Sequence, residues 1–462
     1  MHRHAPVIGV DSSTQSCKVV RCDPDSGEVL GTESANHPDG TEVDPRVWGA
    51  ALDSVLDLDG TAAVSVAGQQ HGLVTLDADG EPVRDALLWN DLRSAPQAAE
   101  LREALGGAQA WCDAVGSAPL PSITVTKLAW MAANEPQLAD RVEAVLLPHD
   151  WLSWRLAGSP AGDYRTDRSD ASGTGYWSTE DGGTYRPDLL ELAFGRVPTL
   201  PRVLGPADAA GTAAGTDVPV GPGAGDNAAA ALGLGLAVGE VAVSLGTSGA
   251  VFAVTDTVQP KPALNRFADA TGRLLPLACT LNAARVLSAS ASMLGVDMPG
   301  WERLVADAPE DAGGVVFLPY LDGERTPDLP GARGSVHGLS RTTMTGPHLA
   351  RAALLGMLCG LADALDVLVD AGVALESVVL IGGAARSAGV RAAAAEVFSV
   401  PVVVPEPAEY VALGAARQAA WVATGELPEW PRPLAARLDP SGAAWGREAR
   451  ERYAEVRDAT YG

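Results

Sequence analysis

One pattern of strand, polar turn and strand occurs twice in the chain. The first copy is VDSSTQSCKVV, residues 10–20, and the second is VSLGTSGAVFA, residues 243–253. Apolar residues flank a short turn rich in Ser, Thr and Gly in both, which predicts two antiparallel hairpins. A chain of 462 residues is longer than one hydrophobic core usually supports. We therefore expect two domains of similar design, residues 1–236 and 237–462, although so short a self-match also arises by chance.

Helical and strand patterns alternate around these hairpins. Helical patterns occur at 45–58, 94–105, 123–133, 349–372, 389–399 and 411–425, and the first of these has apolar spacing near 3.6. Short apolar runs at 61–68, 377–382 and 400–406 are typical of buried strands. Strands and helices in alternation predict an α/β fold. With the repeated hairpin, they suggest two halves with a cleft between them.

The charge balance excludes some partners. The chain has 58 acidic and 33 basic residues, a formal net charge of −25. Nucleic acids and anionic membranes are bound by clustered positive charge, so we expect neither as a partner. The chain has three lysines and no Gly-Lys-Ser/Thr phosphate loop. A phosphate-bearing ligand would need backbone amides, a metal ion or a few arginines.

Cysteines and the N-terminal sequence indicate the compartment. The five cysteines are odd in number and lack the spacing of a zinc site, and we do not expect His2 and His4 to bind a metal. The chain lacks the apolar block of a signal peptide and any charge-free run long enough to cross a bilayer. We expect a reduced, cytoplasmic protein.

The hairpin turns have the composition of phosphate-binding turns. Successive backbone amides in such turns can bind an anion, and hydroxyl groups add donors. Only the first turn has a carboxylate, Asp11, which suits Mg²⁺. Ordinary polar turns are the alternative for each hairpin taken alone. Gly382 and Gly383 follow a strand and form either a simple turn or a close approach to a flat ligand such as adenine, with Arg386 near enough to meet phosphate.

A third feature is one carboxylate set among glycines. In GPGAGDNAAAALGLG, residues 221–235, Asp226 follows Gly223 and Gly225 and precedes a run of small residues with helical character. Glycines in such a loop can serve positive φ angles alone. They can also remove side chains that would block a ligand from reaching the carboxylate.

Nine segments occur in the order found in the FGGY family of carbohydrate kinases, which this chain resembles over nearly its whole length. They are DSSTQS, GQQHG, WNDLR, SITVTKLAWM, TDRSDASGTGYW, GAGDNAAAALG, SLGTSG, FLPYLDGERTPDLPGARGSVHGLS and LIGGAARS. The pair GQQHG and GAGDN is most similar to members that phosphorylate D-xylulose. Three positions depart from the family pattern: Ser12-Ser13 replaces an apolar-Gly pair, Gln70 replaces Met, and Leu355 ends the second signature.

The resemblance implies two actin-like (ribonuclease H-like) domains, ATP and Mg²⁺ as cofactors, and a small sugar as substrate. It implies that Asp226 is the general base, and that the sugar contacts are Gln70, His71, Trp89, Asp226 and Asn227. The implied nucleotide contacts are Asp11, Ser13, Thr14, Gly246, Thr247, Ser248, Gly382, Gly383 and Arg386, with Asp11 also on the metal. A homodimer is expected from the resemblance alone.

Several alternatives stay open at this point. Taken alone, His71 is more typical of a structural histidine and Trp89 of a core residue. Asp167 and Asp170 are either near the site or loop caps. The substrate could instead be ribulose, another ketose, a polyol or an aldonate. A non-catalytic sensor of sugar or nucleotide with an actin-like fold is a further possibility, because fold does not fix function.

Overall fold

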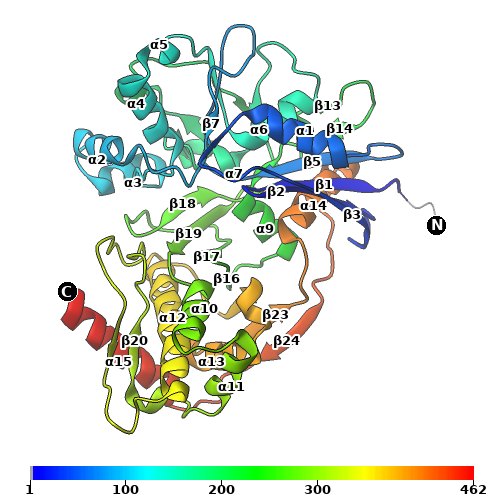
Figure 1. The fold of residues 1–462 in the computed structure, drawn as a ribbon. Helices are drawn as coiled ribbons and strands as arrows, with labels where there is room; N and C mark the ends of the chain where they lie inside the picture. Colours follow the sequence, from blue (N-terminus) through cyan, green and yellow to red (C-terminus); the bar gives the residue numbers. More distant parts are fainter. Residues whose placement is uncertain (1–3) are drawn as a thin grey trace. The chain divides into compact units, whose positions relative to one another are not determined.

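The computed structural model describes residues 4–462, so His2 lies outside it. The chain forms two compact units (Figure 1). Unit 1 comprises the chain up to Leu236 together with Pro260–Leu275 and Glu409–Pro431, and unit 2 comprises Ala237–Gln259, Pro276–Ala408 and Arg432–Gly462. The expected continuous second domain, 237–462, therefore differs from the compact units, because two of its segments belong to unit 1.

Unit 1 is built on a mixed sheet with β1 near its middle. Its strands follow the order β13 (Gly211–Thr212), β14 (Pro219–Val220), β5 (Ala63–Gly68), β1 (Val7–Ser12), β2 (Ser16–Cys22) and β3 (Val29–Asn36), and β15 (Ala224–Gly225) also pairs with β5. Strand β1 is antiparallel to β2 and parallel to β5, with Val7 opposite Cys22 on one side and Ala63 on the other. The first predicted hairpin is thus the centre of this sheet.

Ten α-helices accompany the sheet of unit 1 within the described residues. They are α1 (Pro45–Val55), α2 (Ala95–Ala104), α3 (Ala108–Val115), α4 (Thr124–Asn134), α5 (Pro136–Ala139), α6 (Pro148–Leu156), α7 (Arg168–Ala171), α8 (Pro187–Phe194), α9 (Asp226–Leu234) and α14 (Tyr410–Thr424). Helix α1 begins where the sequence indicates, since the Asp44 side chain accepts a hydrogen bond from the Arg46 amide and Pro45 occupies the first turn. Strand β8 (Ala144–Leu146) leads into α6.

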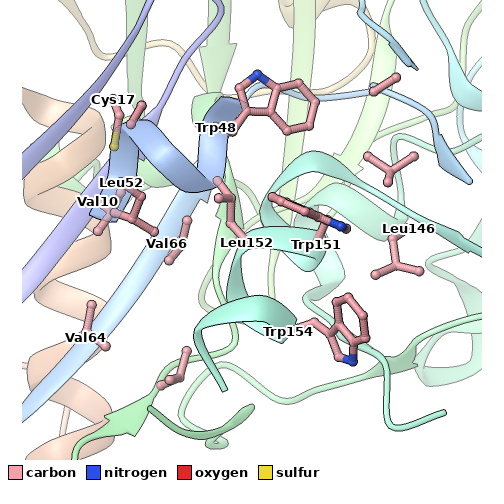
Figure 2. Packing of buried hydrophobic residues seen from close by; sticks show 14 of the residues in the cluster. Val10, Cys17, Trp48, Leu52, Val64, Val66, Leu146, Trp151, Leu152 and Trp154 are labelled. Atoms are coloured by element: carbon pink, nitrogen blue, oxygen red, sulfur yellow. The ribbon is translucent and has the colours of Figure 1, made fainter. Parts of the chain in front are cut away.

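A large apolar core joins one face of this sheet to α1 and α6. Figure 2 shows Trp48 and Leu52 of α1 with Val66 of β5 and with Trp151 and Leu152 of α6 in this cluster. The rings of Trp48 and Trp151 meet edge to face, with centroids 6.5 Å apart. This packing fixes α6, whose first turn contributes to the site described below.

Helix α14 explains why the domain boundary could not be continuous. It packs on β1 and α9 (Figure 1). The residues at this contact are mostly small. A Cβ at Gly9 of β1 would lie 2.0 Å from the Ala412 carbonyl oxygen, and a Cβ at Gly414 would lie 1.8 Å from that of Ala229. A side chain cannot be accommodated at either of these two positions, so both require glycine. The Ala/Gly face of α14 therefore matches unit 1, although its sequence lies far along the chain.

Unit 2 repeats the strand order of unit 1. Its sheet runs β19 (Leu274–Thr280), β17 (Gly249–Ala253), β16 (Glu240–Leu245), β22 (Ser377–Ile381), β23 (Val402–Pro405) and β24 (Leu434–Leu438). Strand β16 is antiparallel to β17 and parallel to β22, as β1 is to β2 and β5. Both units therefore place the first strand of the hairpin beside a parallel strand, so the ends of the two parallel strands meet at one edge.

Unit 2 has five α-helices in the described part of the chain. They are α10 (Ala284–Met293), α11 (Met298–Ala306), α12 (Gly346–Asp370), α13 (Ala388–Phe398) and α15 (Trp445–Tyr461). Of these, α12 and α13 pack on the sheet. Helix α12 is long and apolar enough to span a membrane, but 78% of its most apolar window is buried inside the protein. It is a core helix of unit 2. All five cysteines lie in the described residues, and none of them is in a disulfide bond there.

Candidate active site

Asp226 is the first residue of α9 and follows β15, whose Gly225 pairs with Gly68 at the end of β5. Gly223 has a φ of +84°, and a Cβ there would lie 2.7 Å from the Val66 carbonyl oxygen. A Cβ at Gly225 would lie 2.6 Å from Gln70 Nε2. Both glycines are therefore required by close contacts, and one of them also by a left-handed backbone.

The Asp226 carboxylate is held at one oxygen only. Its Oδ1 accepts hydrogen bonds from the Asn227 backbone N–H (2.8 Å) and side-chain Nδ2 (2.9 Å). Within residues 4–462, Oδ2 has no hydrogen-bond donor. Burial raises the pKa of Asp226 to about 6, against the lowering effect of the two Asn227 bonds. The group is therefore an ionised carboxylate at neutral pH, with one oxygen positioned and the other available.

Gln70 and His71 lie in the turn after β5, beside this carboxylate. Gln70 Oε1 accepts from Asn227 Nδ2 at 2.9 Å, so one amide joins the side chains of Gln70 and Asp226. Gln70 is 4% exposed, and its Nε2 has no acceptor among the described residues. His71 has a φ of +68° and donates from Nδ1 to the Gly173 carbonyl at 2.8 Å. In the neutral ring, this bond places the hydrogen on Nδ1 and leaves Nε2 as the acceptor.

Trp89 is an exposed aromatic side chain tied to the first hairpin turn. It is 42% exposed, so it is not a core residue. Its indole Nε1 donates to Thr14 Oγ1 at 2.9 Å. Because that bond holds the ring in place, Trp89 presents an ordered apolar face with a polar anchor. The structure thus links a residue expected at the sugar to one expected at the nucleotide.

Asp11 is a buried carboxylate at the end of β1. It is 6% exposed, and its Oδ1 has no hydrogen-bond partner in the part of the chain that the structure describes. Burial and the nearby charge of Asp226 raise the pKa of Asp11 to about 7, although Lys18 across the hairpin opposes this shift. A buried carboxylate with an orphaned oxygen is unfavourable in the protein alone.

The turn after Asp11 leaves two amides without acceptors. Ser13 closes the turn, since its N–H and its Oγ both donate to the Ser16 carbonyl at 3.0 Å. The Ser13 hydroxyl proton is directed at the Ser16 carbonyl, and its expected contact with the nucleotide stays a prediction. The backbone N–H groups of Thr14 and Gln15 have no acceptor among residues 4–462. They are the donors that this turn offers to an anion.

The turn of the second hairpin is similar but has no carboxylate. Within the described chain, the backbone N–H groups of Gly246, Thr247 and Ser248 have no acceptor, and Thr247 and Ser248 are exposed. Gly382, with a φ of +93°, lies against the end of β16, since a Cβ there would be 2.6 Å from the Leu245 carbonyl oxygen. The two glycines expected near the nucleotide thus adjoin this turn.

Arg386 ends the short 3₁₀ helix η3 (Gly383–Arg386), which follows Gly382. Its side chain is exposed and has no carboxylate partner in residues 4–462. Gly383 borders open space, since a Cβ there would have no atom within 4 Å. Within the described chain, this corner of unit 2 therefore combines free backbone amides, an open glycine and an unpaired cation.

One group of buried residues near Asp226 is not apparent from the sequence. Asp167 does cap α7, accepting from the amides of Ser169 and Asp170, but it also contacts His149 at 3.0 Å. The sequence signal for this contact is weak. A His-Asp pair shortly after the apolar strand β8 is the one indication that polar groups enter the core there.

Comparisons with known proteins identify the family of the chain. The model of the FGGY family N-terminal domain matches residues 6–233, and that of the C-terminal domain matches residues 241–423. The xylulose kinase of Streptomyces coelicolor is 47% identical over 91% of this chain and 88% of that protein. The one from Streptomyces rubiginosus is 46% identical over 91% and 89%.

A solved structure is similar over the whole chain. The crystal structure of xylulose kinase from Bifidobacterium adolescentis has a TM-score of 0.92 and 41% identity, and it covers 98% of this chain and 99% of that one. Family models that match both units, with relatives of this similarity, show the family. The chain belongs to the FGGY family of carbohydrate kinases.

Proposed function

We propose that this chain transfers the γ-phosphoryl group of ATP to a hydroxyl group of D-xylulose, which yields D-xylulose 5-phosphate and ADP. The substrate is supported by the two Streptomyces xylulose kinases, which are 46% and 47% identical to the chain. The observation that carries the mechanism is the Asp226 carboxylate, with Oδ1 fixed by Asn227 and Oδ2 without a donor within residues 4–462.

Asp226 acts as the general base in this proposal. The sugar hydroxyl oxygen bonds to the γ-phosphorus while the bond from that phosphorus to the ADP oxygen breaks, and the hydroxyl proton passes to Asp226 Oδ2. A pKa of about 6 leaves the carboxylate ionised at neutral pH but more basic than an ordinary aspartate. The absence of a side chain at Gly223 and Gly225 leaves room beside it.

Three side chains bind the sugar. Gln70 Nε2 is a buried donor that lacks an acceptor within the described chain, and a sugar oxygen supplies one. His71 accepts a hydroxyl hydrogen at Nε2 because Nδ1 donates to Gly173. Trp89 lies against the carbon face of the sugar with an exposed ring held by Thr14. Asn227 orients Asp226 and Gln70 together.

The free amides of the two hairpin turns bind phosphate oxygens of ATP. Thr14 in unit 1 and Gly246–Ser248 in unit 2 provide them, and Arg386 adds a positive charge to the second site. Gly382 and Gly383 permit the adenine to approach the backbone of unit 2. In this proposal, residues 1–236 provide the sugar contacts and the general base Asp226, and residues 237–462 provide most of the nucleotide contacts.

Asp11 fits a Mg²⁺ ion carried by the nucleotide. Its orphaned Oδ1 needs a positive partner, and Mg²⁺ commonly takes one or two carboxylates, water and substrate phosphates. No group of three or more His, Cys, Asp or Glu side chains within residues 4–462 could hold a metal alone. When bound, the ion neutralises charge on the phosphates. Asp11 would bind the ion, and its position is fixed by the pairing of β1 within the sheet.

The replacement Asp226→Asn tests the assignment of the base. We expect kcat/KM for D-xylulose to fall by roughly 10²- to 10⁴-fold, because the amide cannot accept the proton. Asp217→Asn, the same change at an exposed position of unit 1, is the control and should leave turnover unchanged. A coupled assay for ADP measures both. Turnover by Asp226→Asn equal to that of the control would refute the base role.

The pH profile gives a second check on the same carboxylate. Asp226, with a pKa of about 6, and Asp11, with a pKa of about 7, are both protonated at low pH. We therefore expect kcat/KM to fall as the pH drops from about 7 through about 6, and to level off above about 7. A panel of ribulose, other ketoses, polyols and aldonates, compared by kcat/KM, tests the choice of D-xylulose. Tight ATP binding without phosphorylation of any sugar would support a sensor instead.

We also infer a cytoplasmic enzyme. Its long apolar helix α12 is a core element, which supports a soluble chain, and its cysteines form no disulfide within the described residues. A homodimer stays a prediction, which light scattering on the purified protein tests.

A further inference from the structure

A cluster of four buried titratable residues lies behind Asp226 in unit 1. His149 and Asp150 lie in the first turn of α6, Asp167 is the N-cap of α7 and Asp170 lies within it, with exposures between 0% and 3%. The proposed function uses none of them. Buried groups of this kind are costly unless their hydrogen bonds are satisfied, so their arrangement needs a physical reason.

The Asp167 carboxylate accepts four hydrogen bonds. Its Oδ1 accepts from His149 Nε2 and from the Asp170 amide, both at 3.0 Å. Its Oδ2 accepts from the Ser169 amide at 2.6 Å and from Ser169 Oγ at 2.5 Å. Burial raises the pKa of Asp167 to about 6, and the hydrogen bonds from Ser169 and Asp170 oppose that rise, so the carboxylate is still ionised at neutral pH. This fixes His149 as a donor at Nε2 and fixes the direction of the Ser169 hydroxyl.

Ser169 connects Asp167 to the backbone segment that precedes Asp226. Its hydroxyl proton points to Asp167, so its lone pair faces the Gly225 N–H, which donates to it at 3.0 Å. Gly225 immediately precedes Asp226. On the other side of the same segment, Gln418 Nε2 donates to the Gly223 carbonyl at 2.8 Å. The backbone that leads into Asp226 is thus held at both ends.

The second nitrogen of His149 completes the cluster. Nδ1 lies 3.0 Å from Asp150 Oδ1, and neither atom has another hydrogen-bond partner among residues 4–462. One carboxyl proton on Asp150, turned toward the Nδ1 lone pair, satisfies both atoms. Burial raises the pKa of Asp150 well above its usual range and lowers that of His149 to about 3, in agreement with a neutral acid beside a neutral ring.

The His149 ring also contacts the glycine segment directly. A Cβ at Gly223 would lie 3.1 Å from His149 Nδ1, and a Cβ at Gly68 would lie 3.0 Å from the His149 Cβ. Asp170, whose pKa is raised well above the usual range by burial and by Asp150, Asp167 and Asp226, faces the His71 backbone. The cluster therefore adjoins the segment that carries Gln70 and His71 and the glycine segment that precedes Asp226.

We propose that Asp150, His149, Asp167 and Ser169 form a directed chain of hydrogen bonds that positions Gly225, and through it the Asp226 carboxylate, for proton transfer. These are positioning residues, since none of them is placed against substrate. The proposal rests on the proposed role of Asp226. It assigns a task to polar residues that a capping role at α7 alone leaves unexplained.

The first test compares two buried serines of the same segment. Ser169→Ala removes the acceptor for the Gly225 N–H. Ser172→Ala is the matched control, because Ser172 Oγ donates to the Ser169 carbonyl at 2.7 Å and accepts from the Ala268 amide at 2.8 Å, away from the Asp226 segment. We expect kcat with D-xylulose to fall about 10- to 100-fold in Ser169→Ala and less than about 3-fold in Ser172→Ala, with similar Tm losses and unchanged KM for ATP.

The second test asks for rescue at His149. The amide of His149→Gln can still donate to Asp167, whereas His149→Leu leaves that carboxylate without its partner. We expect at least tenfold higher kcat in the Gln variant than in the Leu variant, with circular dichroism to check that each is folded. Should the Leu variant not fold, the serine pair still decides the matter.

The outcomes separate this inference from the proposed function. Equal loss of kcat in Ser169→Ala and Ser172→Ala, in proportion to Tm, means a structural role only and overturns the inference. If Asp226→Asn abolishes turnover while Ser169→Ala matches the wild type, the inference fails and the base role stands. If Asp226→Asn is fully active, the proposed base role is wrong, and the inference that depends on it is wrong as well.

Discussion

The two central hairpins have the same topology but differ in charge. β1–β2 and β16–β17 each lie beside a parallel strand, and each turn has amides without acceptors in the described chain. Asp11 is the last residue but one in the first strand of one hairpin, and Ser244 occupies the matching position of the other. Amides alone suffice to bind phosphate oxygens. The difference indicates that binding of a cation falls to unit 1 only.

The unfavourable burial of the Asp11 carboxylate supports the assignment of the cation to unit 1. Ser244 is half-buried in the strand ladder and raises no electrostatic difficulty. Asp11 is buried beside a second carboxylate, Asp226, and one of its oxygens has no partner within residues 4–462. A protein under selection for stability alone would not retain such a group. A cation that arrives with the nucleotide explains why it is there.

Asp11→Asn is the change that should break the comparison most strongly. We expect kcat to fall about 10²- to 10³-fold at saturating Mg²⁺, by analogy with the loss of one electrostatic contact to a transition state. The Tm without ligands should rise, because a neutral amide replaces a carboxylate whose ionised form is disfavoured by burial.

Ser244→Asn supplies the matched control for that experiment. It places the same side chain at the equivalent position of unit 2, where we expect a change of kcat below about 3-fold. Thermal denaturation and the coupled assay measure both variants. If the two variants lose activity equally, or if Asp11→Asn keeps wild-type dependence on Mg²⁺, Asp11 does not have the assigned role.

Much of this comparison could be read from the sequence. The eleven-residue self-match locates both hairpins because strands alternate apolar and polar residues and polar turns interrupt them. The segment GAGDN singles out Asp226 and Asn227, and the close contacts of Gly223 and Gly225 supply the reason for those glycines. Local periodicity and turn chemistry are properties of neighbouring residues, so a sequence displays them.

Other parts depend on contacts between distant residues. Helix α14 packs on unit 1 because its Ala and Gly residues meet the backbone of β1 and α9, which no local pattern indicates. The sequence around Asp167 is compatible with a loop cap, and the residue is one, but its second role needs His149 from another helix. Trp89 is ambiguous in the sequence because exposure is set by the fold and not by residue type.

Replacement of the threonine in each turn, Thr14 or Thr247, should have a smaller effect on activity than Asp11→Asn. Thr14 Oγ1 accepts from Trp89 Nε1, whereas the Thr247 side chain is exposed and has no such partner among the described residues. Thr14→Val should therefore raise KM for D-xylulose and for ATP, each about tenfold, from the loss of roughly 1.4 kcal/mol. Thr247→Val should raise KM for ATP alone.

Steady-state kinetics with each substrate varied in turn measure this pair. A rise in the KM of D-xylulose in both variants would show that Thr14 has no special link to the sugar contact. No rise in the KM of ATP in either variant would remove the turn hydroxyls from the nucleotide site.

The cations near the turns give the smallest expected difference. Lys18, opposite Asp11 in β2, is already paired with Glu409 at 2.6 Å, whereas Arg386 in unit 2 has no carboxylate partner within residues 4–462. An exposed charge contributes up to about 1 kcal/mol, so Arg386→Ala should raise KM for ATP about 3-fold at low salt and leave kcat unchanged. The effect should shrink as salt screens it. A salt-independent rise would mean that Arg386 acts by stacking or packing.

Lys18→Met removes the ion pair between Lys18 and Glu409 and should therefore lower the Tm. It should change KM for ATP less than Arg386→Ala does, because the charge of Lys18 is already paired within unit 1.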